Sequence, residues 1–242
     1  MPSIVWGRHP QEAYEEPYEY GAQDQFVREA TAFLRRMNIA LNRETLKYHR
    51  DERSLGKATW MLAHDLVDAL LDGVLLVQEK RHRVAARVFR DCVETIDLLT
   101  VLHAGGPKAS STLVTWYENR SIPHRDCRAH LEAIGGAEAA KRRRAYYDEL
   151  SKFTHRTYRA LNASYSLGRG DLLVHDSYSR ERMLVLPHVV AAYLAVLADL
   201  IVQAAMVLDK AIPQEEVRDA WSQALESHTV PRRFEPGARA AR

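Results

Sequence analysis

Residues 83–103 have the sequence RVAARVFRDCVETIDLLTVLH, and this stretch decides the fold. When its residues are placed about 100° apart, as in an α-helix, the charged side chains fall within one narrow strip. The strip consists of Arg83, Arg87, Arg90, Glu94 and Asp97. Apolar side chains cover most of the remaining circumference. A helix that is apolar over so much of its surface has neighbours on several sides, so the sequence predicts the central helix of an all-α bundle.

The segments before residue 83 continue the helical spacing. From Gln23 onward, apolar side chains recur every three or four positions and define one amphipathic face. These side chains are Phe26, Ala30, Phe33, Leu34, Met37 and Leu41. A polar run at residues 49–54 ends the pattern. Ser54 is suited to cap a second helix, because its hydroxyl can accept a hydrogen bond from a free backbone N–H group.

Glycine and proline mark the helix ends after residue 103. Gly105, Gly106 and Pro107 stop the central helix, and the pair Gly135-Gly136 stops a later one. We expect further helices over residues 111–118, 121–134, 137–161, 187–208 and 214–226. Strands do not alternate with these helices and no repeat is present, which argues against a parallel α/β sheet.

The chain is predicted to form one domain over residues 23–226, a bundle of about seven helices. Residues 1–22 form an acidic, tyrosine-rich N-terminal arm that three prolines interrupt, and residues 227–242 form a flexible, arginine-rich tail. Between the last helices, residues 172–174 and 183–186 are expected to pair as one small β-hairpin.

The composition is that of an ordinary globular protein. Of 242 residues, 46% are hydrophobic and 27% are charged, which excludes a wholly disordered chain. A net charge of +2 gives no general basic field for nucleic acids. Two cysteines and no signal-peptide pattern favour the cytoplasm. Residues 187–208 are apolar, but Asp199 lies near their centre, which favours a buried core helix and no membrane partner.

Two polar pairs form the candidate site. Arg90 and Glu94 stand four residues apart on the central helix, and Ser151 and His155 have the same spacing on the helix predicted for residues 137–161. One interpretation is an internal ion pair and an ordinary surface histidine. The other brings both pairs together in one polar pocket, with Arg90, Glu94, Ser151 and His155 as catalytic residues. No cofactor or metal ion is expected.

A family resemblance rests on these motifs. The sequence of residues 75–102, followed by TWYENRSI at 115–122 and YYDELSKFTHRTY at 146–158, resembles a family of uncharacterised bacterial helical proteins. That family has an Arg-x-x-x-Glu motif on one helix and a Ser-x-x-x-His motif on a later one. The resemblance implies a helical fold and no established activity.

The chain is more distantly similar to the HEPN superfamily, whose members are helical, usually dimeric and often metal-independent ribonucleases of toxin and phage-defence systems. This similarity implies a homodimer that cleaves RNA. HEPN proteins use an Arg-x(4–6)-His motif, and four pairs in this chain fit that spacing, about as many as chance predicts. They are Arg43/His49, Arg125/His130, Arg169/His175 and Arg182/His188.

The sequence is also compatible with other functions. The main alternative is a non-enzymatic sensor that binds a small ligand, or an adaptor that docks a protein partner through residues 1–22. The spacing of His124, Cys127 and His130 suits a metal ion poorly. The basic cluster at residues 141–144 is expected to be a solvated helix edge rather than a phosphate site.

Overall fold

The structure of the protein is a computed structural model, which describes residues 18–43, 45–79, 81–155, 158, 161, 165–167, 173–175 and 186–211. Seven helices lie within these residues: α2 (Tyr18–Asn42), α3 (Leu55–Gln78), α4 (His82–His103), α5 (Gly106–Tyr117), α6 (His124–Gly135), α7 (Ala137–Thr154) and α9 (Leu186–Ala211). The all-α class predicted from the sequence is therefore confirmed.

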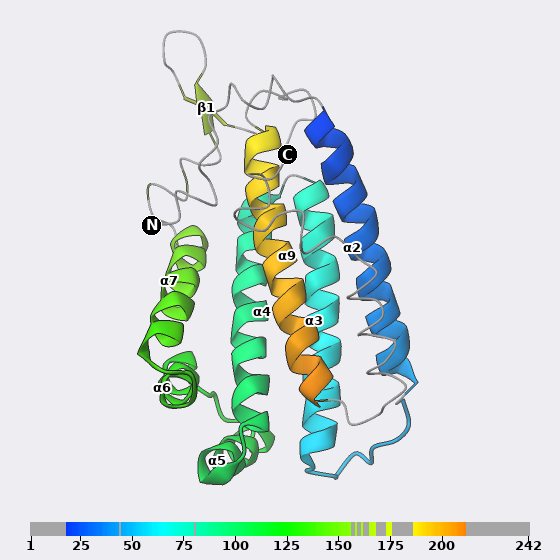
Figure 1. Ribbon diagram of the computed structural model, residues 1–242, viewed down its shortest axis with the longest axis vertical. Helices are drawn as coiled ribbons and strands as arrows, with labels where there is room; N and C mark the ends of the chain where they lie inside the picture. Colours follow the sequence, from blue (N-terminus) through cyan, green and yellow to red (C-terminus); the bar gives the residue numbers. More distant parts are fainter. Residues whose placement is uncertain are drawn as a thin grey trace.

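Helix α4 lies at the centre of the structure. It packs against α3, α5, α6, α7 and α9, whereas α2 packs against α3 and α9. Figure 1 shows α2, α3, α4 and α9 as four long helices, with the shorter α5, α6 and α7 on the far side of α4 from α2. The central position that the apolar surface of residues 83–103 predicted is confirmed.

Leucine supplies most of the largest fully buried side chains of the core. These side chains are Phe89, Leu34, Met37, Leu41, Leu66, Leu70, Leu99, Leu194, Leu197, Leu200 and Ile201. Gly73 of α3 allows a close approach between helices, since a Cβ atom there would lie 2.8 Å from Cε1 of Phe89 on α4. Cys92 is fully buried, as expected for a core residue.

The helix ends follow the capping signals of the sequence. The Ser54 hydroxyl accepts a hydrogen bond from the backbone N–H of Lys57 at 3.1 Å, so Ser54 caps α3 as predicted. Gly105 and Gly136 have φ angles of 76° and 80°, which glycine adopts without the steric penalty of a Cβ atom. Helix α5 begins at Gly106, earlier than predicted, because Pro107 suits a first helical turn.

Two predicted boundaries were wrong. Helix α2 begins at Tyr18, so residues 18–22 belong to a helix and not to the N-terminal arm. The hairpin consists of β1 (Tyr165–Leu167) and β2 (Leu173–His175), which pair antiparallel, whereas Leu186 is the first residue of α9. This pairing needs a shorter connection than the predicted one, and a shorter loop costs less entropy to close.

Other predictions fall outside the described residues. These are the rest of the arm at residues 1–17, the helix at 214–226 and the tail at 227–242. The apolar segment at residues 187–208 forms most of α9, whose side chains at Leu194, Leu197 and Ile201 are buried in the core. Among the helices that the structure describes, none combines the length and the apolar character that crossing a membrane requires.

Candidate functional site

The polar strip of α4 faces other helices. Asp97 is only 2% exposed. Its carboxylate accepts hydrogen bonds from side chains of two other helices. His124 at the start of α6 donates from Nε2 to Oδ2 at 2.7 Å, and Arg143 of α7 donates from Nε to Oδ1 at 2.7 Å. Arg143 also donates to Oε1 of Gln203 on α9. Asp97 therefore ties together four helices in the interior.

Arg90 and Glu94, which also belong to the polar strip of α4, contact α7 as well. Arg90 Nε donates to Glu94 Oε1 at 3.0 Å and to the Tyr147 hydroxyl at 2.9 Å, and Tyr147 donates to Glu94 Oε1 at 2.7 Å. The guanidinium groups of Arg90 and Arg128 lie 5.0 and 5.2 Å from the centre of the Tyr147 ring. The His124 ring lies 4.2 Å from it. One continuous network thus runs between α4, α6 and α7.

The structure brings together only part of the predicted site. Arg90 and Glu94 are paired as expected, and Arg90 Nη1 also donates to the Thr154 hydroxyl at 3.3 Å. The Ser151 hydroxyl is buried without a hydrogen-bond partner among the described residues. His155 is exposed, and neither Ser151 nor His155 bonds to Arg90 or Glu94 within the described part of the chain.

Helix α7 ends before His155. The helix was predicted to continue to residue 161, but it stops at Thr154, and His155 is its C-cap with φ −78° and ψ 157°. The Thr154 hydroxyl donates to the backbone carbonyl of Ser151 at 2.8 Å. Such local side-chain bonds compete with helical hydrogen bonding. The backbone N–H of His155 still donates to the Ser151 carbonyl at 3.1 Å, so His155 follows Ser151 by one helical turn, but α7 does not continue to residue 161 as predicted.

Sequence reasoning missed three residues of the network. Arg143 was expected at a solvated helix edge, yet its side chain is 18% exposed and paired with Asp97. His124 was weighed only as a metal ligand, and Tyr147 only as part of a family motif. The one available signal was Asp97 itself, the last carboxylate in the charged strip of a helix that is apolar over most of its circumference. Within the described ranges, no three His, Cys, Asp or Glu side chains are grouped to hold a metal ion.

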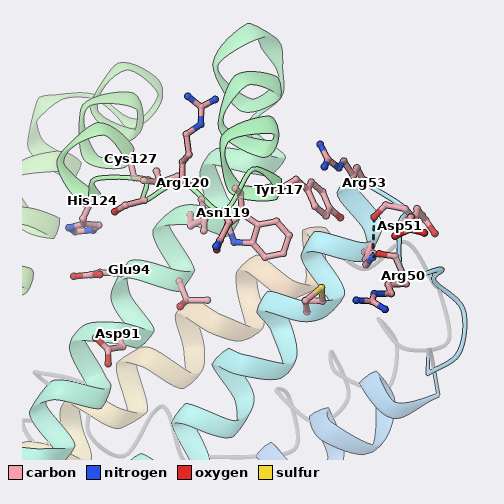
Figure 2. A pocket seen from close by; sticks show the side chains of 18 residues that line it. Arg50, Asp51, Arg53, Asp91, Glu94, Tyr117, Asn119, Arg120, His124 and Cys127 are labelled. Carbon is pink, nitrogen blue, oxygen red and sulfur yellow. Dashed lines mark hydrogen bonds between the residues drawn. The ribbon is translucent and has the colours of Figure 1, made fainter.

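A cavity of about 1000 Å³ opens beside this network. Its walls come from the loop before α3, from α4, from the end of α5 and from the start of α6 (Figure 2). Four cationic side chains line it, namely Arg50, Arg53, Lys57 and Arg120. Four carboxylates also line it, namely Asp51, Glu52, Asp91 and Glu94. The cavity is thus charged with both signs, and Glu94 and His124 connect it to the network.

Some of these charges are used to hold the loop before α3. Lys57 donates from Nζ to the backbone carbonyls of His49 at 2.8 Å, of Glu52 at 3.1 Å and of Arg50. The Glu52 carboxylate accepts hydrogen bonds from the Ser54 hydroxyl and, at 3.3 Å, from the backbone N–H of His49. Lys57 and Glu52 are therefore structural.

Four other charged side chains line the cavity and are exposed. Among the residues that the structure describes, Arg50, Asp51, Arg53 and Asp91 make no side-chain hydrogen bond or ion pair. Burial raises the pKa of Asp91, and repulsion from Glu94 raises it further. The surroundings of Asp91 thus leave its negative charge only partly compensated.

Aromatic rings form one wall of the cavity. Trp116 and Tyr117 pack edge to face with ring centroids 4.9 Å apart. The Tyr117 hydroxyl donates to the backbone carbonyl of Ser54 at 2.8 Å, which fixes the end of α5 against the loop. Cys127 also lines the cavity, but burial raises the pKa of its thiol to about 11, so it is a poor nucleophile.

A second cavity of about 540 Å³ lies between α4, α6, α7 and α9. Most of its lining is apolar, including Ile134 and Met206, which are half exposed. Asp97 and Arg143 contribute polar groups to its wall. Because His124 lines the first cavity and Asp97 the second, the hydrogen bond between them is part of the partition between the two.

Comparison of the chain with known protein families, with curated proteins and with solved structures found no match. The resemblance to an uncharacterised helical family and to HEPN ribonucleases stays a prediction.

Proposed function

We propose that this protein binds a small, polar, charged molecule in the larger cavity. The observation that carries this proposal is a concave site of about 1000 Å³ lined by charged side chains of both signs, four of which make no hydrogen bond or ion pair with the described residues. Small-molecule sites typically have volumes of roughly 300–1000 Å³. The proposal corresponds to the ligand-binding alternative that the sequence leaves open.

The unpaired charges favour binding over a purely structural role. Where a charge only stabilises the fold, it has partners within the protein, as Lys57 and Glu52 do. Arg50, Arg53 and Asp91 make no such side-chain hydrogen bonds within the described part of the fold. A bound ligand of complementary charge would supply their hydrogen bonds, which are strong when both partners are ionised.

The balance of charge also separates this proposal from the ribonuclease prediction. The four carboxylates of the cavity offset its four cationic side chains, so the lining lacks the excess of positive charge with which proteins bind a chain of phosphates. A compact molecule can place its charged groups against selected side chains instead. Ribonuclease activity and homodimer formation stay predictions from the resemblance, with no observation of the geometry in their favour.

A thermal-shift experiment on the full chain tests the proposal. Nucleotides, amino acids, dicarboxylates and polyamines are added separately, and small molecules released from protein purified from its natural host are identified by mass spectrometry. A ligand at roughly 100 times its Kd adds about 2.7 kcal/mol to the free energy of unfolding. For a chain of this length, that corresponds to a Tm increase of about 5–10 °C.

Matched variants locate the binding site. Ser121 is exposed and lines the cavity, so Ser121→Trp is expected to narrow the cavity and abolish the Tm increase. Ser110 is an exposed serine of α5 outside the lining, and Ser110→Trp should retain the full effect. The proposal is wrong if no compound raises Tm and no molecule is released, or if both variants respond like the wild type.

A further inference from the structure

The second cavity, which has a volume of about 540 Å³, has a polar end and an exposed end. At the polar end, Arg143 of α7 bonds to Asp97 of α4 and to Gln203 of α9. Helices α4 and α9 run in the same direction (Figure 1), and the lining reaches from residue 97 to Ala104 on one and from residue 203 to Lys210 on the other. Each of these stretches spans about 10 Å at a helical rise of about 1.5 Å per residue. The cavity is therefore elongated along both helices.

The polar side chains of its wall are bonded within the protein, with one exception. Each of the bonded side chains makes at least one hydrogen bond, and they are Asp97, Thr100, His103, Arg143 and Gln203. Lys210 is exposed and makes no side-chain hydrogen bond or ion pair among the residues that the structure describes. A ligand would therefore find one free polar group in this wall, the ammonium group of Lys210.

Apolar side chains form most of the remaining wall. Ile134 of α6 and Met206 of α9 are half exposed, and Leu131 and Val207 lie in the same lining. Removing such surfaces from water is favourable, and the flexible methionine side chain adapts to the shape of what it contacts. The volume of the cavity lies within the range of roughly 300–1000 Å³ that is typical of small-molecule sites. The wall is therefore suited to an apolar tail.

The charges of the wall favour a negatively charged head group. Its cationic side chains are Arg143 and Lys210, and its one carboxylate is Asp97. Because Arg143 and Asp97 are paired with each other, the positive charge of Lys210 stays uncompensated. Burial lowers the pKa of His103, so its ring is neutral at pH 7 and adds no charge.

We propose that the second cavity binds an unbranched carboxylate of medium chain length. Its tail would lie along α4 and α9 over the apolar wall, and its carboxylate would lie beside Lys210 at the exposed end. An extended octanoate ion has about the length of the lining. This site is separate from the one in the proposed function and takes a ligand of a different class.

Isothermal titration of the full chain with butanoate, hexanoate, octanoate and dodecanoate, each below its micelle concentration, tests the inference. Burial of a methylene group raises affinity about fourfold, so octanoate should bind about 15-fold more tightly than hexanoate. The gain per methylene should fall between octanoate and dodecanoate, because the longer tail extends out of the cavity. Octanol and octylamine, which have the same tail with a neutral and a cationic head, should bind more weakly than octanoate.

One pair of variants tests the contact with the head group. Lys210→Gln should weaken octanoate about two- to fivefold, as expected for an exposed ion pair, and should leave the affinity for octanol unchanged. Lys141 is exposed on α7 outside the lining, and Lys141→Gln is the matched control that keeps the preference for octanoate.

A second set of variants locates the tail. Ala104 is exposed and lines the cavity, so Ala104→Trp should fill it and abolish octanoate binding, whereas Ala145→Trp on the exposed face of α7 should not. Ser121→Trp, which narrows the larger cavity, should also leave octanoate binding unchanged. Circular dichroism confirms that each variant is folded, and Lys210→Gln, an exposed change, tests the inference even where Ala104→Trp does not fold.

Four results overturn the inference. They are an affinity that does not rise with tail length, octylamine binding as tightly as octanoate, an unchanged preference for octanoate over octanol in Lys210→Gln, and equal binding by Ala104→Trp and Ala145→Trp. If Ser121→Trp abolishes octanoate binding, the acid occupies the larger cavity and its assignment to the second cavity is wrong. The absence of octanoate binding leaves the proposed function unaffected, since that function depends on the larger cavity.

Discussion

Replacing Asp97 by asparagine is expected to destabilise the protein strongly. Asp97 is 2% exposed, and Arg143 and His124, with side chains 18% and 9% exposed, both bond to it. Asparagine has nearly the same shape, so Asp97→Asn removes the charge without opening a cavity. The guanidinium of Arg143 then keeps the neutral oxygens of Gln203, Val93 and the new amide as acceptors, and Asp199 is the remaining carboxylate with which it interacts.

The size of the effect follows from this burial. Removing one partner of a buried ion pair typically costs about 3–5 kcal/mol, because the other charge is left uncompensated. Arg143 is partly exposed, keeps neutral acceptors and still interacts with Asp199, so we expect a loss at the lower end, about 3 kcal/mol. For a chain of this length, such a loss lowers Tm by about 6–12 °C.

Urea denaturation followed by circular dichroism measures the free energy of unfolding of each variant. Asp91→Asn, an exposed change on the same helix, is the control and should alter stability by less than about 0.5 kcal/mol. The double variant Asp97→Asn/Arg143→Gln should be more stable than the sum of its single changes, by about 1–3 kcal/mol. A loss below about 1 kcal/mol for Asp97→Asn, or additive single changes, would refute the ion-pair argument.

Three further predictions concern other parts of the molecule. Burial lowers the pKa of His103, so the unfolded chain takes up a proton before the folded chain does, and wild-type stability falls as the pH drops below the ordinary histidine pKa of 6.5. His103→Gln should weaken this dependence, measured as the difference in unfolding free energy one pH unit above and below that value. Gly73→Ala places a Cβ atom 2.8 Å from Phe89 and should cost about 1–3 kcal/mol in urea denaturation, whereas Gly73→Ala in a Phe89→Leu background should cost less. Because His155 is exposed beyond the end of α7, His155→Ala should leave stability and any EDTA-resistant cleavage of total RNA unchanged, and loss of cleavage would show that this histidine is catalytic after all.

The sequence was most informative about the long helices. The spacing of apolar residues predicted a central helix over residues 83–103, and α4 begins only one residue earlier, at His82. The same reasoning placed the long apolar segment of α9 in the core. These elements are predictable because a helix with a wide apolar surface has to bury it, whatever its partners are. The end of α7 was missed because the apolar spacing over residues 137–161 contains no signal at Thr154, the last residue of the helix.

The site was less predictable, since its members come from distant segments. Arg90 and Glu94 are four residues apart, so the helical spacing alone pairs them. Asp97 and Arg143 are 46 residues apart, and nothing in either local sequence selects the other. The larger cavity depends on the loop before α3, where no apolar spacing specifies the path of the chain. Its unpaired arginines therefore looked like ordinary surface residues.

The hydrogen bond between Asp97 and His124 separates the two cavities and therefore limits how either cavity could be re-engineered. An engineered binding site in the larger, charged cavity has to keep both residues. Replacing either one would also change the wall of the second, mostly apolar cavity. Ser121 lines only the larger of these two cavities and Met206 only the second. Substitutions at these residues can therefore alter each cavity independently.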